Sequence, residues 1–160
     1  MAYHDDLLQQ AIELVHRDPM NPKQVDLRRA VSAAYYALFH LLISETVSNW
    51  SRASSRDALG RMFDHGMMKK VSSRISNSQL FPFTGEDPVV AQNLKRVAQS
   101  FVQLQDKRHI ADYDNATFWT LTEALTEVTT ATKAFAAWKV IQAEDIAQNY
   151  LVSLLIKPRD

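Results

Sequence analysis

Apolar residues recur at helical spacing through most of this chain, and no other feature limits its possible folds as strongly. Between Lys23 and Asn49 they follow one another at intervals of four, three, four and three residues, so they form one stripe along a helix. The stripe consists of Leu27, Val31, Ala34, Leu38 and Leu41. Only 3 of the 160 residues are glycine, which excludes the glycine-rich phosphate loops of Rossmann and P-loop folds.

Similar stripes predict four more helical segments. The expected segments are 4–17, 23–49, 55–75, one from 88 to an end between 108 and 114, and 116–151, with a loop over 76–85. Gly66 can interrupt the third segment. Asp87 followed by Pro88 is typical of a helix start, and Asn115 is a candidate N-cap for the last segment. The sequence therefore predicts an all-α, up-and-down bundle of about five helices, in a single domain spanning residues 1–160.

The last segment is too long for a compact bundle of this size. An unbroken helix over 116–151 would be about 54 Å long. Either it bends, for which the threonine run 129–132 is a candidate because threonine has low helix propensity, or its far end packs on a partner. The large apolar residues expected to lie exposed there are Trp138, Leu151, Leu154 and Leu155. We therefore expect a homodimer.

The charge balance argues against a general nucleic-acid binder. Lys plus Arg and Asp plus Glu are 18 each, so the net charge is zero. There is no cysteine, which excludes disulfides, thiolate catalysis and cysteine-ligated zinc. No histidine or carboxylate spacing is diagnostic of a metal site. We therefore expect neither a metal nor a cofactor.

The N-terminal residues do not resemble a targeting segment. Residues 1–10 contain Asp5 and Asp6 and no basic region, unlike a secretory signal peptide. No run reaches the roughly 18 consecutive apolar residues that span a bilayer. We expect a cytoplasmic protein without membrane contact.

The second segment carries a polar seam beside its apolar stripe. At 100° per residue, Arg29, Tyr36 and His40 fall within about 60° of one another. Two interpretations stay open. The seam can be a hydrogen-bonded contact between helices, in which the tyrosine and histidine tips find partners, or it can line a pocket for a ligand.

Arg108 stands in register with the buried stripe of the fourth segment, after Val97, Phe101 and Leu104. An arginine on a core face needs a partner, and Asp112 lies four residues further on. The pair predicts either a structural ion pair that holds the corner between the last two segments or an anion-binding arginine in a cleft.

The third segment places Arg61, His65 and Lys69 at intervals of four residues. This spacing favours a solvent-exposed helical face, with a phosphate-contacting stripe as the alternative.

Two motifs together resemble the HEPN family (higher eukaryote and prokaryote nucleotide-binding domain). The run Arg28-Arg29-Ala-Val-Ser-Ala-Ala-Tyr35-Tyr36-Ala-Leu-Phe-His40 is similar to the signature of that family's second helix. Residues 108–114 are similar to the motif after its penultimate long helix, in the Arg-x-x-Ala-Asp-Tyr form of one bacterial branch, and His65-Gly66 also suits that branch. The resemblance covers nearly the whole chain.

The resemblance implies a four- to five-helix bundle that forms a homodimer with a cleft at the interface. Many such domains are metal-independent ribonucleases of defence and toxin–antitoxin systems, whose partner is encoded by a neighbouring gene, and others bind nucleotides or proteins without catalysis. Arg108 and His109 match the arginine and the polar position of the catalytic motif. No histidine follows His109, and Asp112 and Tyr113 stand where the catalytic histidine is expected.

Three functions are therefore open. A ribonuclease needs a cation for the phosphate and a base for the 2′-hydroxyl, for which Arg108 and either His109 or His40 are the candidates. A binding module would hold the phosphate of a nucleotide or RNA. Its candidate ligand-binding residues are Arg29, Tyr36, His40, Arg108, Asp112 and Tyr113. The third function is a non-catalytic, dimeric protein-interaction module. Zero net charge favours the last two.

Overall fold

The computed structural model describes residues 2–79 and 83–156, and within these ranges the chain is all-helical, as the sequence predicts. It has seven α-helices and one short 3₁₀ turn, rather than about five helices. They are α1 (Tyr3–Val15), α2 (Gln24–Ser48), the 3₁₀ turn (Ala53–Ser55), α3 (Arg56–Gly60), α4 (His65–Ser76), α5 (Pro88–Tyr113), α6 (Leu121–Ile141) and α7 (Asp145–Ser153).

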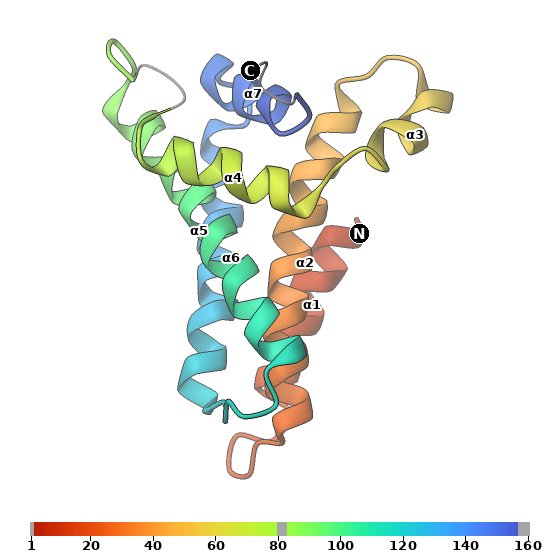
Figure 1. The fold of residues 1–160 in the computed structure, drawn as a ribbon, viewed down its shortest axis with the longest axis vertical. Helices are drawn as coiled ribbons and strands as arrows, with labels where there is room; N and C mark the ends of the chain where they lie inside the picture. The colour runs from red at the N-terminus through yellow and green to blue at the C-terminus, as the bar shows by residue number, and fades with distance from the viewer. Residues whose placement is uncertain (1, 80–82, 157–160) are drawn as a thin grey trace.

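Four long helices, α1, α2, α5 and α6, make up the bundle, and α4 crosses it (Figure 1). The α1–α2 and α5–α6 corners lie at one end, and α7 lies at the other. α2 is the central helix and packs against α1, α5 and α6. Among the described helices, α2 alone has the length and hydropathy to cross a membrane, but 61% of that apolar stretch is buried inside the bundle.

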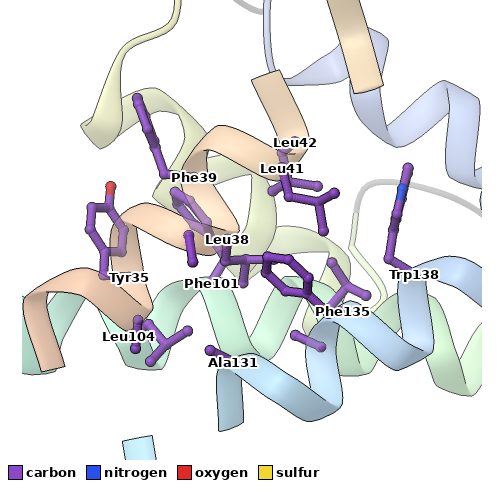
Figure 2. Packing of buried hydrophobic residues seen from close by; sticks show 14 of the residues in the cluster. Tyr35, Leu38, Phe39, Leu41, Leu42, Phe101, Leu104, Ala131, Phe135 and Trp138 are labelled. Atoms are coloured by element: carbon purple, nitrogen blue, oxygen red, sulfur yellow. The ribbon is translucent and has the colours of Figure 1, made fainter. Parts of the chain in front are cut away.

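The core forms where the predicted stripes meet. Leu38 of α2, Phe101 and Leu104 of α5, and Phe135 and Trp138 of α6 belong to one cluster of buried residues (Figure 2). Small residues on α2 let the neighbouring helices approach closely. They are the fully buried Ala30, Ala34 and Ala37. The stripes of α2 and α5 are therefore confirmed as core faces.

The third expected segment is two helices, so the prediction of one helix over 55–75 was wrong. The chain turns at 61–64, and the carboxylate of Asp64 accepts a hydrogen bond from the backbone N–H of Met67 at 2.8 Å, which caps α4. Gly66 lies inside α4 and interrupts nothing. Arg61 precedes the break, so it does not share a helical face with His65 and Lys69. Residues 80–82 of the expected loop lie outside the described residues.

The last expected segment also differs from the prediction. α6 begins at Leu121 with Thr120 as its cap, so Asn115 was the wrong cap, and residues 114–120 form a corner. The threonine run does not end the helix, because α6 continues through it to Ile141. The hydroxyls of Thr130 and Thr132 donate to carbonyls four residues earlier, at 2.9 and 3.0 Å, and so keep their hydrogen bonds within the helix. The chain turns instead at 142–144 and continues as α7.

This turn buries three of the four apolar residues that we expected to lie exposed, and the fourth, Leu155, is half-buried. Trp138, Leu151 and Leu154 are each 1% exposed in a single chain, and the buried hydroxyls of Tyr150 on α7 and Ser72 on α4 are hydrogen-bonded at 2.7 Å. Their assignment to a partner surface was wrong. The homodimer stays a prediction that rests on the family resemblance.

Two side chains near the start of α2 hold the corner between α5 and α6. The guanidinium of Arg28 donates to the carbonyls of Ala111 and Asp114 at 2.9 Å each and to that of Thr117 at 2.5 Å. The amide of Gln24 donates to the carbonyl of Trp119 at 2.7 Å and accepts from its N–H at 2.9 Å. These bonds supply partners to backbone groups that follow the end of a helix.

Replacing Arg28 with alanine should therefore lower the free energy of unfolding by about 2–4 kcal/mol, because carbonyls at the corner lose charged donors. The neighbouring Arg29→Ala is the matched control. Arg29 is exposed, and its loss should cost less than about 0.5 kcal/mol. Urea unfolding of both variants measures the difference, and equal midpoints would contradict this account of the corner.

Candidate functional site

Arg108 is a mostly buried cation on the last turns of α5. Its side chain is 12% exposed, and its guanidinium carbon lies 5.0 Å from the ring centre of Tyr35 and 5.7 Å from that of Tyr36. One guanidinium nitrogen, Nη1, is 3.7 Å from the Asp112 carboxylate, which is longer than a hydrogen bond. The buried Nε has no hydrogen-bond partner within the described ranges. Cation–π contacts therefore hold Arg108 in place and leave its donors under-used.

This geometry favours one of the two interpretations of the Arg108–Asp112 pair. A structural pair should be short and should hold the corner after α5. The corner is held instead by Arg28, and Asp112 keeps 28% of its side chain exposed. An arginine with spare donors beside solvent fits the anion-binding interpretation better.

Arg108 opens into a pocket of about 510 Å³, here called the Arg108 pocket. It is lined by Lys69, Gln105, Asp106, Arg108, His109 and Ile110. Lys69 Nζ and an Asp106 oxygen form an ion pair at 2.5 Å. The side-chain carbonyl of Gln105, like Nε of Arg108, is buried without a partner among the described residues. Two unmatched polar atoms thus belong to side chains of one pocket, which is unusual for a purely structural region.

A second and larger hollow, the α1–α2 groove, has a volume of about 710 Å³. Arg29, Ser32 and Tyr36 of α2 line it together with Asp112 of α5. The Ser32 hydroxyl donates to Asp112 at 3.4 Å, and Arg17 and Asp26 are paired at 3.1 Å along the same groove. Three of the predicted ligand-binding residues, Arg29, Tyr36 and Asp112, therefore share one surface.

The predicted site residues thus divide between two hollows. Arg108 and His109 line one, and Arg29, Tyr36 and Asp112 line the other; the Arg108–Asp112 pair lies between them. The remaining two residues line neither. His40 lies further along α2, where its ring packs 4.8 Å from that of Tyr3. Tyr113 is exposed, with its ring 5.1 Å from that of His109.

His65 belongs to the Arg108 cluster, although its spacing with Arg61 and Lys69 suggested a solvent-exposed face. It is the first residue of α4, stacks on Phe39 with ring centres 4.2 Å apart, and is hydrogen-bonded through Nδ1 to the Tyr35 hydroxyl at 2.5 Å. The Tyr35 ring lies under Arg108, so His65 and Arg108 meet through one tyrosine. The sequence signal was His65-Gly66 within the family resemblance.

Burial favours the uncharged forms of Tyr35, His65 and His40. Burial raises the pKa of Tyr35 above its ordinary value, although Arg108 acts in the opposite direction. Burial and then the charge of Arg108 lower the pKa of His65, which Asp64 partly opposes. At neutral pH a protonated Tyr35 hydroxyl therefore shares one hydrogen bond with Nδ1 of a neutral His65. Burial likewise lowers the pKa of His40, with further contributions from His65 and His4.

Within residues 2–79 and 83–156, no three histidine or carboxylate side chains converge as metal ligands.

Comparison with known proteins found no matching family model, no matching curated protein and no matching solved structure. The function therefore has to be argued from the geometry of the two hollows and the chemistry of their side chains.

The two low histidine pKa values predict acid sensitivity. Below the ordinary value of 6.5, the unfolded chain binds more protons than the folded chain, in which His40 and His65 resist protonation. The free energy of unfolding should therefore fall as the pH drops through 6.5 and keep falling until both histidines are protonated in the folded chain. Urea unfolding above and below pH 6.5 measures this decrease.

A double variant, His40→Gln with His65→Gln, is the control, because it removes both titrating rings and leaves the carboxylates unchanged. It should lose less stability than the parent chain over the same interval. An identical pH dependence in the two proteins would assign the acid sensitivity to other groups.

Proposed function

We propose that this chain is a HEPN-like helical domain that binds the phosphate group of a nucleotide or RNA at Arg108. The observation that carries the proposal is the state of this guanidinium: nearly buried, packed on two tyrosines, weakly paired and with an unpartnered Nε. A phosphate supplies the acceptors that the fork of the guanidinium lacks, and two parallel hydrogen bonds make such contacts strong.

The surroundings of Arg108 support this proposal. Lys69 and His109 line the same pocket and can add donors to a bound phosphate. The exposed ring of Tyr113 beside His109 offers a surface on which a base can stack. Because the net charge is zero, binding would depend on this local site and not on a general attraction to polyanions.

Arg108→Gln should weaken the binding of a nucleotide or a short RNA by about tenfold or more, because it removes a charge-assisted pair of hydrogen bonds. Isothermal titration calorimetry or fluorescence anisotropy measures the loss. Stability should change little, since Asp112 stays hydrated when its cation is removed. Binding to RNA should also weaken with salt, with a slope of roughly 0.7 per phosphate contact on logarithmic axes.

Arg96→Gln is the matched control. It removes the same charge from the same helix about 18 Å away along its axis, at an exposed position. Equal losses in the two variants would mean that binding is diffuse, and unchanged binding in Arg108→Gln would remove the basis of the proposal.

A metal-independent ribonuclease is the second candidate, and the position of His65 favours it. The expected histidine after Arg108 is missing, but α4 brings His65 to the ring of Tyr35, which lies under Arg108. A neutral histidine near a phosphate-binding arginine has the composition that 2′-hydroxyl attack requires. His109, in the Arg108 pocket itself, is the other possible base.

Incubation of RNA with the protein in excess EDTA tests this candidate. We expect weak cleavage or none, because His65 is held by Tyr35 and the motif lacks its histidine. Robust cleavage that disappears in Arg108→Gln and in either His65→Gln or His109→Gln would instead establish the enzyme. Cleavage that survives all three variants would come from a contaminant.

The family resemblance extends the proposal to the biological setting. A HEPN-like domain of this kind would act in the cytoplasm as a homodimer, in a bacterial defence or toxin–antitoxin system, with a partner encoded by a neighbouring gene.

A non-catalytic, dimeric interaction module is the third candidate function. The exposed side chains of Tyr113 and Phe118, near the α5–α6 corner, are the apolar groups with which it could contact a partner.

A further inference from the structure

Asp112 is a carboxylate beside the proposed phosphate site, and most of its hydrogen-bonding capacity is unused. The Ser32 hydroxyl, at 3.4 Å, and Nη1 of Arg108, at 3.7 Å, both contact the same oxygen, Oδ2. The other oxygen, Oδ1, accepts no hydrogen bond from the described residues, and 28% of the side chain is exposed. A carboxylate has about four acceptor sites, so Asp112 can accept further donors from a ligand.

The charges around Asp112 restrict which ligand group can lie against it. A ligand anion would be repelled by the carboxylate itself. A ligand cation would be repelled by the guanidinium of Arg108, which is 3.7 Å from the carboxylate. A neutral O–H or N–H donor avoids both repulsions and gains a hydrogen bond to an ionised acceptor. The ligand group at Asp112 is therefore a neutral donor.

The spacing of the two side chains requires this donor to lie close to the phosphate. Arg108 and Asp112 are one helical turn apart on α5, which is about 6 Å along the helix axis. In a ribonucleotide the 2′-hydroxyl belongs to the same sugar that carries the phosphate, so both groups can reach the two side chains together. The α1–α2 groove, of about 710 Å³, begins at Asp112 and leaves room for the rest of the nucleoside.

The carboxylate is held in position before any ligand binds. Arg28 donates to the backbone carbonyls of Ala111 and Asp114, on either side of Asp112, at 2.9 Å each. Ser32 contacts the side chain from α2. An acceptor whose position is fixed by the fold discriminates between ligands better than a mobile one, because less ordering cost opposes the correct contact.

We propose that Asp112 determines ligand specificity by accepting a hydrogen bond from the ribose 2′-hydroxyl of the ligand whose phosphate binds Arg108. This inference rests on the proposed function, because it needs the phosphate at Arg108. The 2′-hydroxyl is the group that distinguishes RNA from DNA. The site therefore prefers ribonucleotides, and the same carboxylate weakens the binding of a phosphate that brings no donor.

The test measures the binding of matched ligands to the full chain by isothermal titration calorimetry. One pair is uridine 5′-monophosphate and its 2′-deoxy form, and the other is oligouridylate and oligodeoxyuridylate of equal length. Inorganic phosphate is the probe without a donor sugar. The parent chain should bind the ribose member of a pair about tenfold more tightly, the effect of one charge-assisted hydrogen bond at a partly hydrated site.

Two variants of Asp112 separate the hydrogen bond from the charge. Asp112→Ala has no acceptor and should bind both members of each pair equally. Asp112→Asn keeps a weaker, neutral acceptor, so the preference should shrink severalfold. Both variants should bind inorganic phosphate more tightly than the parent chain, because the repulsion is gone. A folding defect would weaken every probe instead. Glu144→Gln, which removes an exposed carboxylate near α7, is the control and should leave all affinities unchanged.

The ligand pairs also identify the source of the ribose. A preference within the mononucleotide pair would assign the site to free ribonucleotides, and a preference confined to the oligonucleotide pair would assign it to RNA. Equal binding within both pairs, or a preference that survives Asp112→Ala, would overturn the role of Asp112 and leave the phosphate site intact if Arg108→Gln still abolishes binding. Binding that Arg108→Gln does not affect would overturn the proposed function, and this inference with it.

Discussion

The position of the proposed phosphate site depends on three hydrogen bonds from Arg28 to carbonyls in the last turn of α5 and in the corner that follows it. These bonds fix where α5 ends and how residues 114–120 leave it. Arg108 and His109 lie on the turn before this point, and Thr117 and Trp119 lie just after it. A charged donor with three backbone acceptors leaves little freedom to the corner, so side chains on either side keep a defined geometry.

Arg28 and Arg108 show why the same residue type has different roles in one chain. The guanidinium of Arg28 donates to three backbone carbonyls, so its charge stabilises the fold itself. Arg108 has two aromatic rings and a distant carboxylate, which hold the guanidinium in place without using its donors. The role of Arg28 cannot be predicted from the sequence, because its acceptors are backbone carbonyls more than 80 residues away.

The spacing of apolar residues predicted the features of the fold that depend only on helical phase. The stripes of α2 and α5 and the buried register of Arg108 follow from helical phase alone, and the structure confirms them. The break before α4 and the return of α7 depend on contacts across the bundle, such as Tyr150 with Ser72. The place of His65 depends on the hydroxyl of Tyr35, 30 residues earlier. Such long-range pairing is absent from any window of the sequence.

The end of α5 lies between two hollows. Ile110 lines both the Arg108 pocket and a smaller pocket of about 290 Å³ at the α5–α6 corner, so one apolar side chain forms their common wall. On one side of it lies the mostly buried Arg108, and on the other side lies the buried carboxylate of Glu127, which accepts from the amide nitrogen of Gln103 at 3.1 Å. A chain with zero net charge thus carries a mostly buried cation and a buried acid in neighbouring hollows that share Ile110.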